Sequence, residues 1–145
     1  MSSVKSAQAR IIMDVALKKG RELNMKPLAI SVLDAGGNLV GFLRDDMSSI
    51  MRFEISSGKA YACLGMGMGG RDLLARSAQM PVFMNALQAR APKGFFPMRG
   101  GVLIRDAAGE VVGAVGVSGD TSENDELCAI AGIEAAGLKA DAGTA

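Results

Sequence analysis

The chain has 145 residues, of which 49% are hydrophobic and 21% charged, so we expect one packed domain over residues 1–145 and not a disordered chain. It has 16 Lys and Arg residues and 15 Asp and Glu residues, and the net charge of +1 gives no general electrostatic reason to bind nucleic acid or a membrane surface. The chain has no histidine, which excludes Ser–His–Asp and Cys–His catalysis and every metal or heme site that needs a histidine ligand.

The N-terminal part of the chain predicts a helix. Its apolar residues recur with helical spacing and share one face: Val4, Ala7, Ile11, Ile12 and Val15. Ser2 or Ser3 can cap the start of this helix, and Gly20 can mark its end, although Leu23 could extend it. A second helix is predicted over residues 48–68, where the apolar stripe is less complete.

Two segments of similar sequence each predict a β-hairpin, because apolar runs flank a glycine-containing turn in both. The predicted strands are residues 28–33 and 39–43 in the first hairpin and residues 102–104 and 111–117 in the second. Shared turn chemistry explains the similarity more simply than an internal duplication does. Since helices flank and separate the hairpins, we expect an α+β domain with one sheet covered by helices.

The remaining segments are predicted from their caps and their spacing. Short helices are expected at 72–79 and 81–89, and the proline- and glycine-rich residues 91–101 should form a long loop. Ser122 is the expected cap of the last helix. The buried face of that helix is predicted to hold Leu127, Ile130, Ala131 and Leu138. We expect the tail at 140–145 to be frayed.

The second hairpin carries an unusual run of small residues toward the end of its last strand. Ala114, Gly116 and Ser118 alternate onto one face, which indicates that something approaches this backbone closely. A ligand or a tightly packed helix would both fit, and we favour the helix. Gly119 then leads into the last helix, whose free N–H groups favour an anion, although simple capping explains the same residues.

Three basic residues could bind a carboxylate or phosphate. Arg44 follows the first hairpin, where a guanidinium can hold a carboxylate in a bidentate fork, and the alternative is a surface pair with a neighbouring aspartate. Lys59 lies among small residues and could hold an anion or act as a base, and the alternative is an ordinary helix-surface lysine. Arg99 precedes two glycines in the predicted loop, where a ligand-facing position is expected.

The sulfur-containing residues and the ends of the chain give further expectations. Cys63 and Cys128 form no CxxC motif, so two reduced thiols in a cytoplasmic protein are the simplest interpretation, and no zinc motif is found. The 10 methionines indicate adaptable core or interface packing more than soft metal ligation. We see neither a signal-peptide pattern nor a run of about 18 apolar residues, and we expect no membrane partner.

Several motifs together resemble the GlcG/HbpS-like family, which includes heme-binding sensor-associated proteins and the C-terminal domain of PduO-type corrinoid adenosyltransferases. The resemblance covers nearly the whole chain, and its most specific piece is Gly-Ala-Val-Gly-Val-Ser-Gly at 113–119. The other pieces are Val32-Leu33-Asp34-x-x-Gly37-x-Leu39-Val40, Arg44-x-Asp46, Lys59-Ala60, Gly100-Gly101 and Asp125.

The resemblance implies a profilin-like α/β/α domain with a five-stranded antiparallel sheet, a homo-oligomer, and binding of heme or a related ligand in some members. The residues that it carries over as ligand-binding are Arg44, Lys59, Gly100, Gly101, Gly116, Ser118 and Gly119, with Asp125 as a further site residue. Without histidine, axial ligation of heme would need Met, Tyr61, Cys or a weak oxygen such as that of Thr121, so the sequence disfavours heme and leaves the cofactor unknown.

Two functions from different classes remain open. The first is a homo-oligomer that binds a small molecule such as heme, a corrinoid or a related metabolite. The second is a cofactor-independent lyase, isomerase or hydratase of a catabolic pathway. In it, Arg44 or Arg99 would hold the anion of a small oxygenated or carboxylated substrate, and Lys59 or Asp125 would move a proton. We slightly favour the binding protein, because most of the matched motif residues are glycines.

Overall fold

The computed structural model describes residues 2–145 and contains both predicted hairpins and all of the predicted helices. The helices are α1 (Ser6–Glu22), α2 (Arg52–Met66), α3 (Gly70–Gln79), α4 (Pro81–Arg90) and α5 (Ser122–Ala135). The strands are β1 (Ala29–Asp34), β2 (Leu39–Arg44), β3 (Gly101–Arg105), β4 (Val111–Ser118) and β5 (Lys139–Asp141).

All five strands join one antiparallel sheet in the order β2-β1-β4-β3-β5. The two hairpins meet where β1 pairs with β4, from Ala29 opposite Ser118 to Asp34 opposite Gly113. Because β2 and β5 are the outer strands, each offers one unpaired backbone edge. The α+β class and the five-stranded antiparallel sheet are therefore confirmed.

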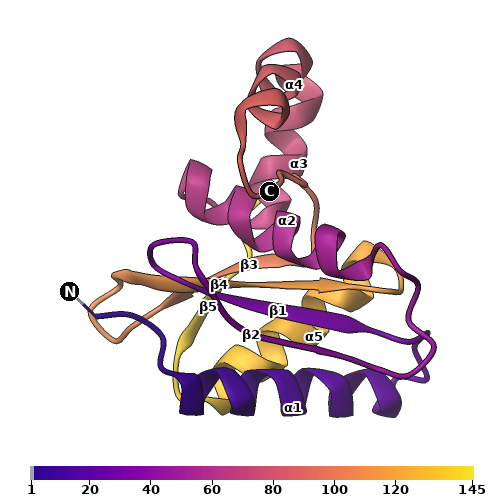
Figure 1. Ribbon diagram of the computed structural model, residues 1–145. Coiled ribbons are helices and arrows are strands. Elements are labelled where there is room, and N and C mark those ends of the chain that lie inside the picture. The colour runs from indigo at the N-terminus through magenta and orange to yellow at the C-terminus, as the bar shows by residue number, and fades with distance from the viewer. Residues whose placement is uncertain (1) are drawn as a thin grey trace.

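The helices cover both faces of the sheet and make a three-layer α/β/α arrangement (Figure 1). Helices α1 and α5 pack on one face, and α2 packs on the other. A cluster of buried apolar side chains fills each of the two interfaces, with Ile12, Ile30 and Val115 in the larger cluster and Leu33, Cys63 and Leu103 in the smaller one. Burial of this apolar surface is the main force that holds the layers together.

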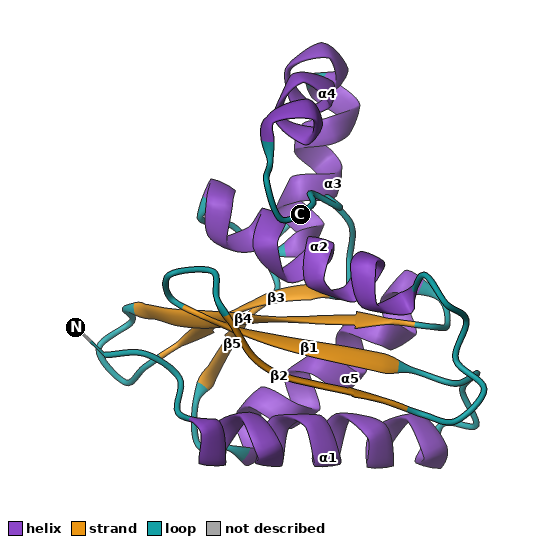
Figure 2. Cartoon of the chain, viewed as in Figure 1, coloured by secondary structure: helices purple, strands orange, loops and turns teal. Residues whose placement is uncertain are grey.

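Helices α3 and α4 project from the α2 side as an arm (Figure 2). The arm begins at Gly70 and returns to the sheet through residues 91–100, which form a loop as predicted. Near the end of the arm, Met84 is buried, whereas Val82 is 83% exposed and Phe83 46% exposed. The arm therefore presents apolar side chains that the single chain leaves uncovered.

Three predictions about helix caps and the tail are wrong. Ser3 does not cap α1, because its hydroxyl accepts from the Ala35 N–H at 3.0 Å and so ties the N-terminal segment to the first hairpin. Helix α1 runs past Gly20 to Glu22 with Leu23 as its C-cap, so the longer of the two predicted ends is confirmed. Thr121 and not Ser122 caps α5, with its hydroxyl accepting from the Asn124 N–H at 3.2 Å. In the tail, residues 140 and 141 belong to β5 on the edge of β3, and the N–H groups of Thr144 and Ala145 donate to Asp72.

The buried face of α5 also differs from the prediction. Leu127 is 46% exposed, while the neighbouring Glu126 and Cys128 are fully buried. The helix turns its charged and small residues inward, because Glu126 meets two arginines and Gly132 lies against the backbone of α1 at Ile12. Apolar periodicity alone could not detect a helix face whose buried members include carboxylates.

Candidate functional site

The small-residue face of β4 is covered by α2. A Cβ on Gly116 would collide with the carbonyl oxygen of Ser56, and one on Gly101 would lie 2.7 Å from the carbonyl oxygen of Lys59. These glycines let the helix backbone approach the strands closely. The favoured interpretation of this face, packing by a helix, is confirmed, and the helix is α2.

The inner face of α2 also brings Lys59 to Asp125 at the start of α5. The Lys59 ammonium donates to the Val117 carbonyl oxygen at 2.8 Å and to Asp125 Oδ2 at 3.3 Å. The two side chains are only 4% and 2% exposed. Burial lowers the pKa of Lys59 and raises the pKa of Asp125, and the attraction between them opposes both shifts.

A second cluster of charges adjoins this pair. Arg71 donates to the fully buried Glu126 carboxylate through Nε at 2.9 Å, and Arg99 donates to it through Nη2 at 3.0 Å. Burial by itself would raise the pKa of Glu126, but hydrogen bonds and charge from the two arginines outweigh it and lower that pKa. Arg99 is therefore engaged with α5, and its remaining ion pair, with Glu123 at 3.7 Å, also lies on that helix.

The structure thus brings most of the predicted site residues to one end of the sheet, where β4 ends and α5 begins. They are Lys59, Arg99, Gly100, Gly101, Gly116, Ser118, Gly119 and Asp125. Lys59 and Asp125 bond to each other and to nearby backbone, Arg99 bonds to Glu126, and Ser118 accepts from Arg52 at 2.8 Å. A Cβ on Gly100 would lie 2.7 Å from the Lys59 ammonium, so the glycine makes room for that side chain.

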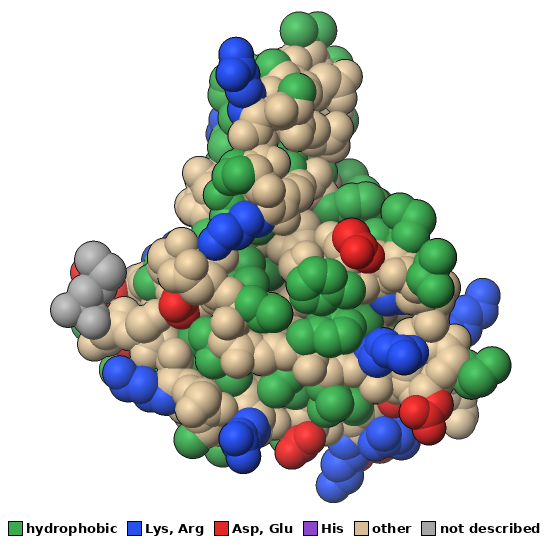
Figure 3. Space-filling model, in the orientation of Figure 1, with side chains coloured by type: hydrophobic (Ala, Val, Ile, Leu, Met, Phe, Trp, Pro, Cys, Tyr) green, Lys and Arg blue, Asp and Glu red, His purple; other side chains and the backbone are tan. Residues whose placement is uncertain are grey.

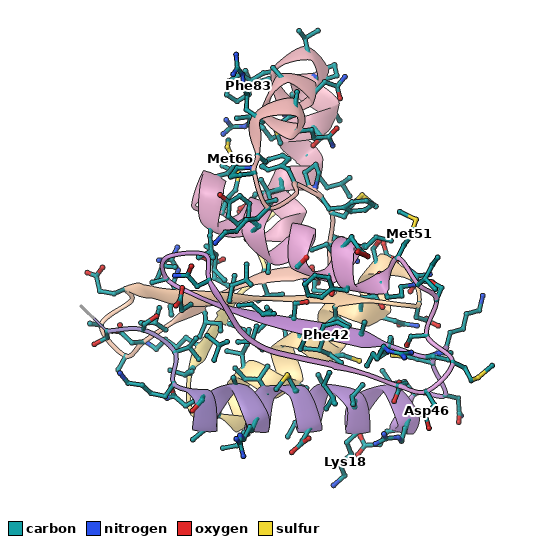
Figure 4. The ribbon with its side chains drawn as sticks, in the orientation of Figure 1. Lys18, Phe42, Asp46, Met51, Met66 and Phe83 are labelled. Carbon is teal, nitrogen blue, oxygen red and sulfur yellow. The ribbon has the colours of Figure 1, made fainter. Side chains whose placement is uncertain are left out.

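Arg44 lies apart from this cluster. It is exposed at the end of the edge strand β2, and Ala29 and the whole width of β1 separate it from β4. On the α1 side of the sheet it lines an open groove of about 800 Å³ that also holds Lys18, Arg21 and Asp46. Lys18 and Asp46 are labelled on that side in Figure 4. Because this groove mixes cations and anions, it indicates no particular ligand.

Three smaller cavities follow one another along the outer face of α2, and we name each by its basic residue. The Arg44 cavity, of about 250 Å³, is lined by Phe42, Arg44, Ser48, Ser49, Ile50 and Phe53. The Lys93 cavity, of about 330 Å³, is lined by Leu33, Gly37, Leu39, Phe53, Ser57, Tyr61 and Lys93. The Arg90 cavity, of about 200 Å³, is lined by Tyr61, Gly65, Met66, Leu87, Arg90, Ala91, Pro92 and Phe95.

The Lys93 cavity is the central one, and two aromatic residues of α2 bound it. Phe53 meets Phe42 edge to face with ring centroids 5.0 Å apart. At the other end, the Tyr61 ring packs so closely on Gly37 that a Cβ there would lie 3.1 Å from the ring. Figure 3 shows apolar side chains gathered on this face between β2 and α2, with basic side chains on either side.

Lys93 closes the side of the central cavity. Its ammonium donates to the Gly37 carbonyl oxygen at 3.2 Å and to the Asn38 amide oxygen at 3.3 Å, so it joins the loop after α4 to the first hairpin. Both acceptors are neutral, so the positive charge of Lys93 stays uncompensated by these contacts. An ammonium has three N–H donors, and a ligand acid could accept the third.

Sequence reasoning missed the lining of this site. Phe53, Ser57 and Tyr61 recur every four residues, which places them on one face of a helix, and this spacing is a signal that could have been found. The stripe was not singled out because the opposite face of α2 carries the small residues and Lys59. Lys93 had no such signal, since only the path of the loop brings it to the hairpin.

The described residues give no indication of a metal centre. Residues 2–145 hold no group of three or more Cys, Asp or Glu side chains that could surround a metal ion. Cys63 and Cys128 are free and buried, and burial raises the pKa of each thiol to about 12. Both thiols are therefore protonated at neutral pH and are poor metal ligands. Within the same residues, no helix is long and apolar enough to span a bilayer.

Comparison with known proteins identifies one family. A family model described as "Haem degrading protein HbpS-like" matches residues 4–134. An uncharacterized 15.0 kDa protein of the dhaT-dhaS intergenic region of Citrobacter freundii is 30% identical over 129 residues, which cover 89% of each chain.

Solved structures show the same fold. Protein ORFY of Klebsiella pneumoniae superposes with a TM-score of 0.83 at 28% identity, over 94% of this chain and 92% of that one. A complex of PduOC with heme superposes with a TM-score of 0.81 at 19% identity, over 98% and 99% of the two chains. An HbpS double mutant of Streptomyces reticuli gives a TM-score of 0.79 at 22% identity, over 92% and 87%.

Proposed function

This chain belongs to the HbpS-like family, as the resemblance of its motifs indicated, and on that basis we propose that it binds a small molecule with an apolar body and an acidic group. We assign the ligand to the Lys93 cavity, between the outer face of α2 and the hairpin of β1 and β2. The assignment moves the site away from the β4 face, which the protein fills with its own helix.

The composition of the Lys93 cavity carries this proposal. Its walls are leucine and aromatic side chains, and its only charged lining residue is Lys93. A mostly apolar pocket with a few convergent polar groups is typical of small-molecule sites, and about 330 Å³ lies within their usual range. The hydroxyl groups of Ser57 and Tyr61 complete the set of polar groups that could orient a ligand.

Heme, a corrinoid or a related cofactor has the required combination of an apolar ring and acidic side chains. PduOC, a structural neighbour, has been solved with heme. In this chain Tyr61 would supply the ligand oxygen for a bound iron and Met66 a thioether, since both line cavities on α2 and the two cysteines are protonated and buried. Tyr61 lines both the Lys93 and the Arg90 cavity and Met66 lines the Arg90 cavity, so these donors would stand in place of the histidine that the sequence lacks.

We further propose that the protein acts as a homo-oligomer in the cytoplasm. Exposed apolar residues support an oligomer, because Met47, Ile50 and Val82 are each more than 80% exposed. The reduced state of the two buried cysteines is consistent with a reducing compartment.

The alternative, a cofactor-independent lyase, isomerase or hydratase, finds less support in the geometry. Lys59 and Asp125 are paired and buried, and neither lines any of the cavities described above. Of the two arginines that could hold the substrate anion, Arg44 lies on the far side of β1 from them, and Arg99 is engaged with Glu126 and Glu123. A proton-transfer site needs these groups within reach of one substrate.

Two probes test the binding proposal: hemin, followed by its Soret band, and anilinonaphthalene sulfonate, followed by its fluorescence. We expect saturable binding of at least one of them by the full chain. Ser57→Trp, which fills the Lys93 cavity, should abolish binding, and Lys93→Met should weaken it by roughly tenfold or more, since a charged hydrogen bond contributes about 1.5–3 kcal/mol.

The matched control is Ile11→Trp, which places the same bulky group at an exposed position of α1, away from the cavities. It should bind both probes like the unmodified chain. If Ser57→Trp is shown to be folded by circular dichroism and binds both probes as tightly as the Ile11→Trp control, the Lys93 cavity is not the site and the proposal is wrong. Tyr61→Phe should alter the Soret spectrum of bound hemin, because it removes the phenolic oxygen that would ligate the iron.

A further inference from the structure

The three cavities on α2 form a series along one helix. The Arg44 and Lys93 cavities share Phe53 as a wall, and the Lys93 and Arg90 cavities share Tyr61. From Phe53 to Gly65 the helix advances twelve residues, or about 18 Å at 1.5 Å per residue. In Figure 4, Met51 lies at one end of α2 and Met66 at the other.

The charges that line this series are all of one sign. Each cavity has one basic residue, namely Arg44, Lys93 or Arg90, and no Asp or Glu is among their lining residues. The whole chain, in contrast, is almost evenly balanced, with 16 basic and 15 acidic residues. Three cations beside apolar walls favour a ligand that is apolar along its length and carries more than one acidic group.

The cations at the two ends lack ion-pair partners. Among residues 2–145, every ion pair involves other basic residues, and neither Arg44 nor Arg90 takes part in one. The carboxylate of Asp45, next to Arg44, is engaged with Arg21 at 3.4 Å and with the Leu28 N–H at 2.9 Å. Glu54 lies beside Phe53 on α2 but is exposed and lines none of the three cavities.

We propose that the three cavities act as one extended site, and that its ligand is an elongated apolar molecule with an acidic group at each end. The inference rests on the proposed function, since the body of the ligand occupies the Lys93 cavity. One acidic group meets Arg44 and the other meets Arg90, where each guanidinium can bind a carboxylate through two parallel hydrogen bonds. A compact acid fills only the central cavity and engages Lys93 alone.

The test compares hexadecanedioic acid with hexadecanoic acid, which has the same chain length and one acidic group fewer. Their affinities for the full chain are measured by displacement of anilinonaphthalene sulfonate. We expect the long diacid to bind about tenfold more tightly than the monoacid, because it gains a second charged contact. Hexanedioic acid, too short to reach both arginines, should show no such gain.

Variants at the two ends identify the contacts. The Arg44→Gln variant and the Arg90→Gln variant should each bind the long diacid about tenfold more weakly than the unmodified chain does. The affinity for the monoacid should change by less than about twofold in either variant, because a single acid can use either remaining cation. The double variant should bind the diacid and the monoacid equally. Arg10→Gln is the matched control, since Arg10 is an exposed arginine of α1 outside the series, and it should change neither affinity.

The outcomes separate this inference from the proposed function. Equal affinities for diacid and monoacid, or a diacid affinity unchanged in both end variants, would overturn the extended site while Ser57→Trp still abolished probe binding. If Ser57→Trp left probe and diacid binding intact, both the Lys93 cavity and the extended site would be wrong.

Discussion

At the scale of single residues, the pair of Lys59 and Asp125 shows what burial does to charge. Both side chains are almost completely removed from water, and burial shifts the pKa of each toward its neutral form. The pair is held by backbone partners as well, at the Val117 carbonyl oxygen and the Asp120 N–H. Such pairs contribute little net stability, but breaking one leaves an uncompensated charge. We therefore expect the pair of Lys59 and Asp125 to hold α2, β4 and α5 together.

A double-mutant cycle tests this role. Lys59→Met should lower the free energy of unfolding by about 3–5 kcal/mol, because Asp125 would lose its cation in a buried position. Adding Asp125→Leu should restore most of that loss, since no charge then remains to be buried. Urea denaturation of the two single variants, the double variant and the unmodified chain measures the effect. A Lys59→Met variant as stable as the unmodified chain would contradict the buried pair.

Glu126 should make the stability of the protein depend on pH. The two arginines lower the pKa of its carboxyl in the folded state, so the unfolded chain binds the proton more readily. This stabilisation is present above the unfolded pKa, which is about 4.3, and it is lost as the pH falls through the lower folded pKa. Glu126→Gln should thus flatten the decrease in melting temperature between about pH 6 and pH 3.

Thermal unfolding followed by circular dichroism at several pH values measures this effect. Glu123→Gln is the matched control, because Glu123 is 62% exposed and its pairing with Arg99 spans 3.7 Å. The control should retain nearly the full pH dependence. An equal slope in all three proteins would show that Glu126 does not titrate as the structure implies.

At the scale of elements, α2 has two faces with different tasks. Its inner face carries Ser56, Lys59 and Ala60 and fits the glycines of β3 and β4, while its outer face carries Phe53 and Tyr61 and lines the cavities. The close inner contact holds the helix against the sheet and thereby sets the depth of the outer cavities. A substitution on the inner face of α2 should therefore disturb ligand binding on its outer face.

Two glycine substitutions separate these effects. Gly116→Ala introduces a methyl group where the Ser56 carbonyl oxygen lies, and we expect it to destabilise the fold by about 1–3 kcal/mol and to weaken probe binding. Gly65→Ala, in α2 with no atom within 4 Å of its new methyl group, should instead stabilise by about 0.5–1 kcal/mol. Urea denaturation of both variants measures the difference. Equal stability of the two would contradict the close packing of α2 on β4.

At the scale of the whole molecule, the arm of α3 and α4 extends away from the sheet and its layers (Figure 2). A pair of helices this short gains most of its stability from packing against something else. The exposed Val82 and Phe83 near its end remain uncovered in the single chain. A second copy of the chain would cover them, in agreement with the proposed homo-oligomer.

Light scattering after size exclusion measures the assembly. We expect a mass several times that of one chain, and we expect the double variant Val82→Glu, Phe83→Glu to shift it to a smaller species, since charges are costly in an apolar interface. Gln88→Glu, also exposed on α4, is the control and should leave the mass unchanged. An unmodified chain that elutes as a monomer would refute the oligomer.

Local sequence determined the elements of this protein. Apolar periodicity and turn glycines located both hairpins and the helices, because hydrogen bonding along a helix or across a tight turn depends on near neighbours in the chain. The motif of residues 113–119, together with the other matched motifs, indicated the family, and the family resemblance predicted the five-stranded sheet. The three residues of β5 were missed, since an edge strand this short is stabilised by β3 and not by its own sequence.

Only the tertiary structure decided which residues share a site. Lys59 and Asp125 were each singled out from the sequence, but their pairing depends on how α2 and α5 pack on β4. Arg44 was predicted to share a site with them, but it lies two strands away. It lies instead at one end of the series of cavities on α2, whose central cavity is lined by Tyr61 from that helix and Lys93 from a distant loop. Distances between segments far apart in the chain are fixed by packing of the layers, and no local pattern encodes them.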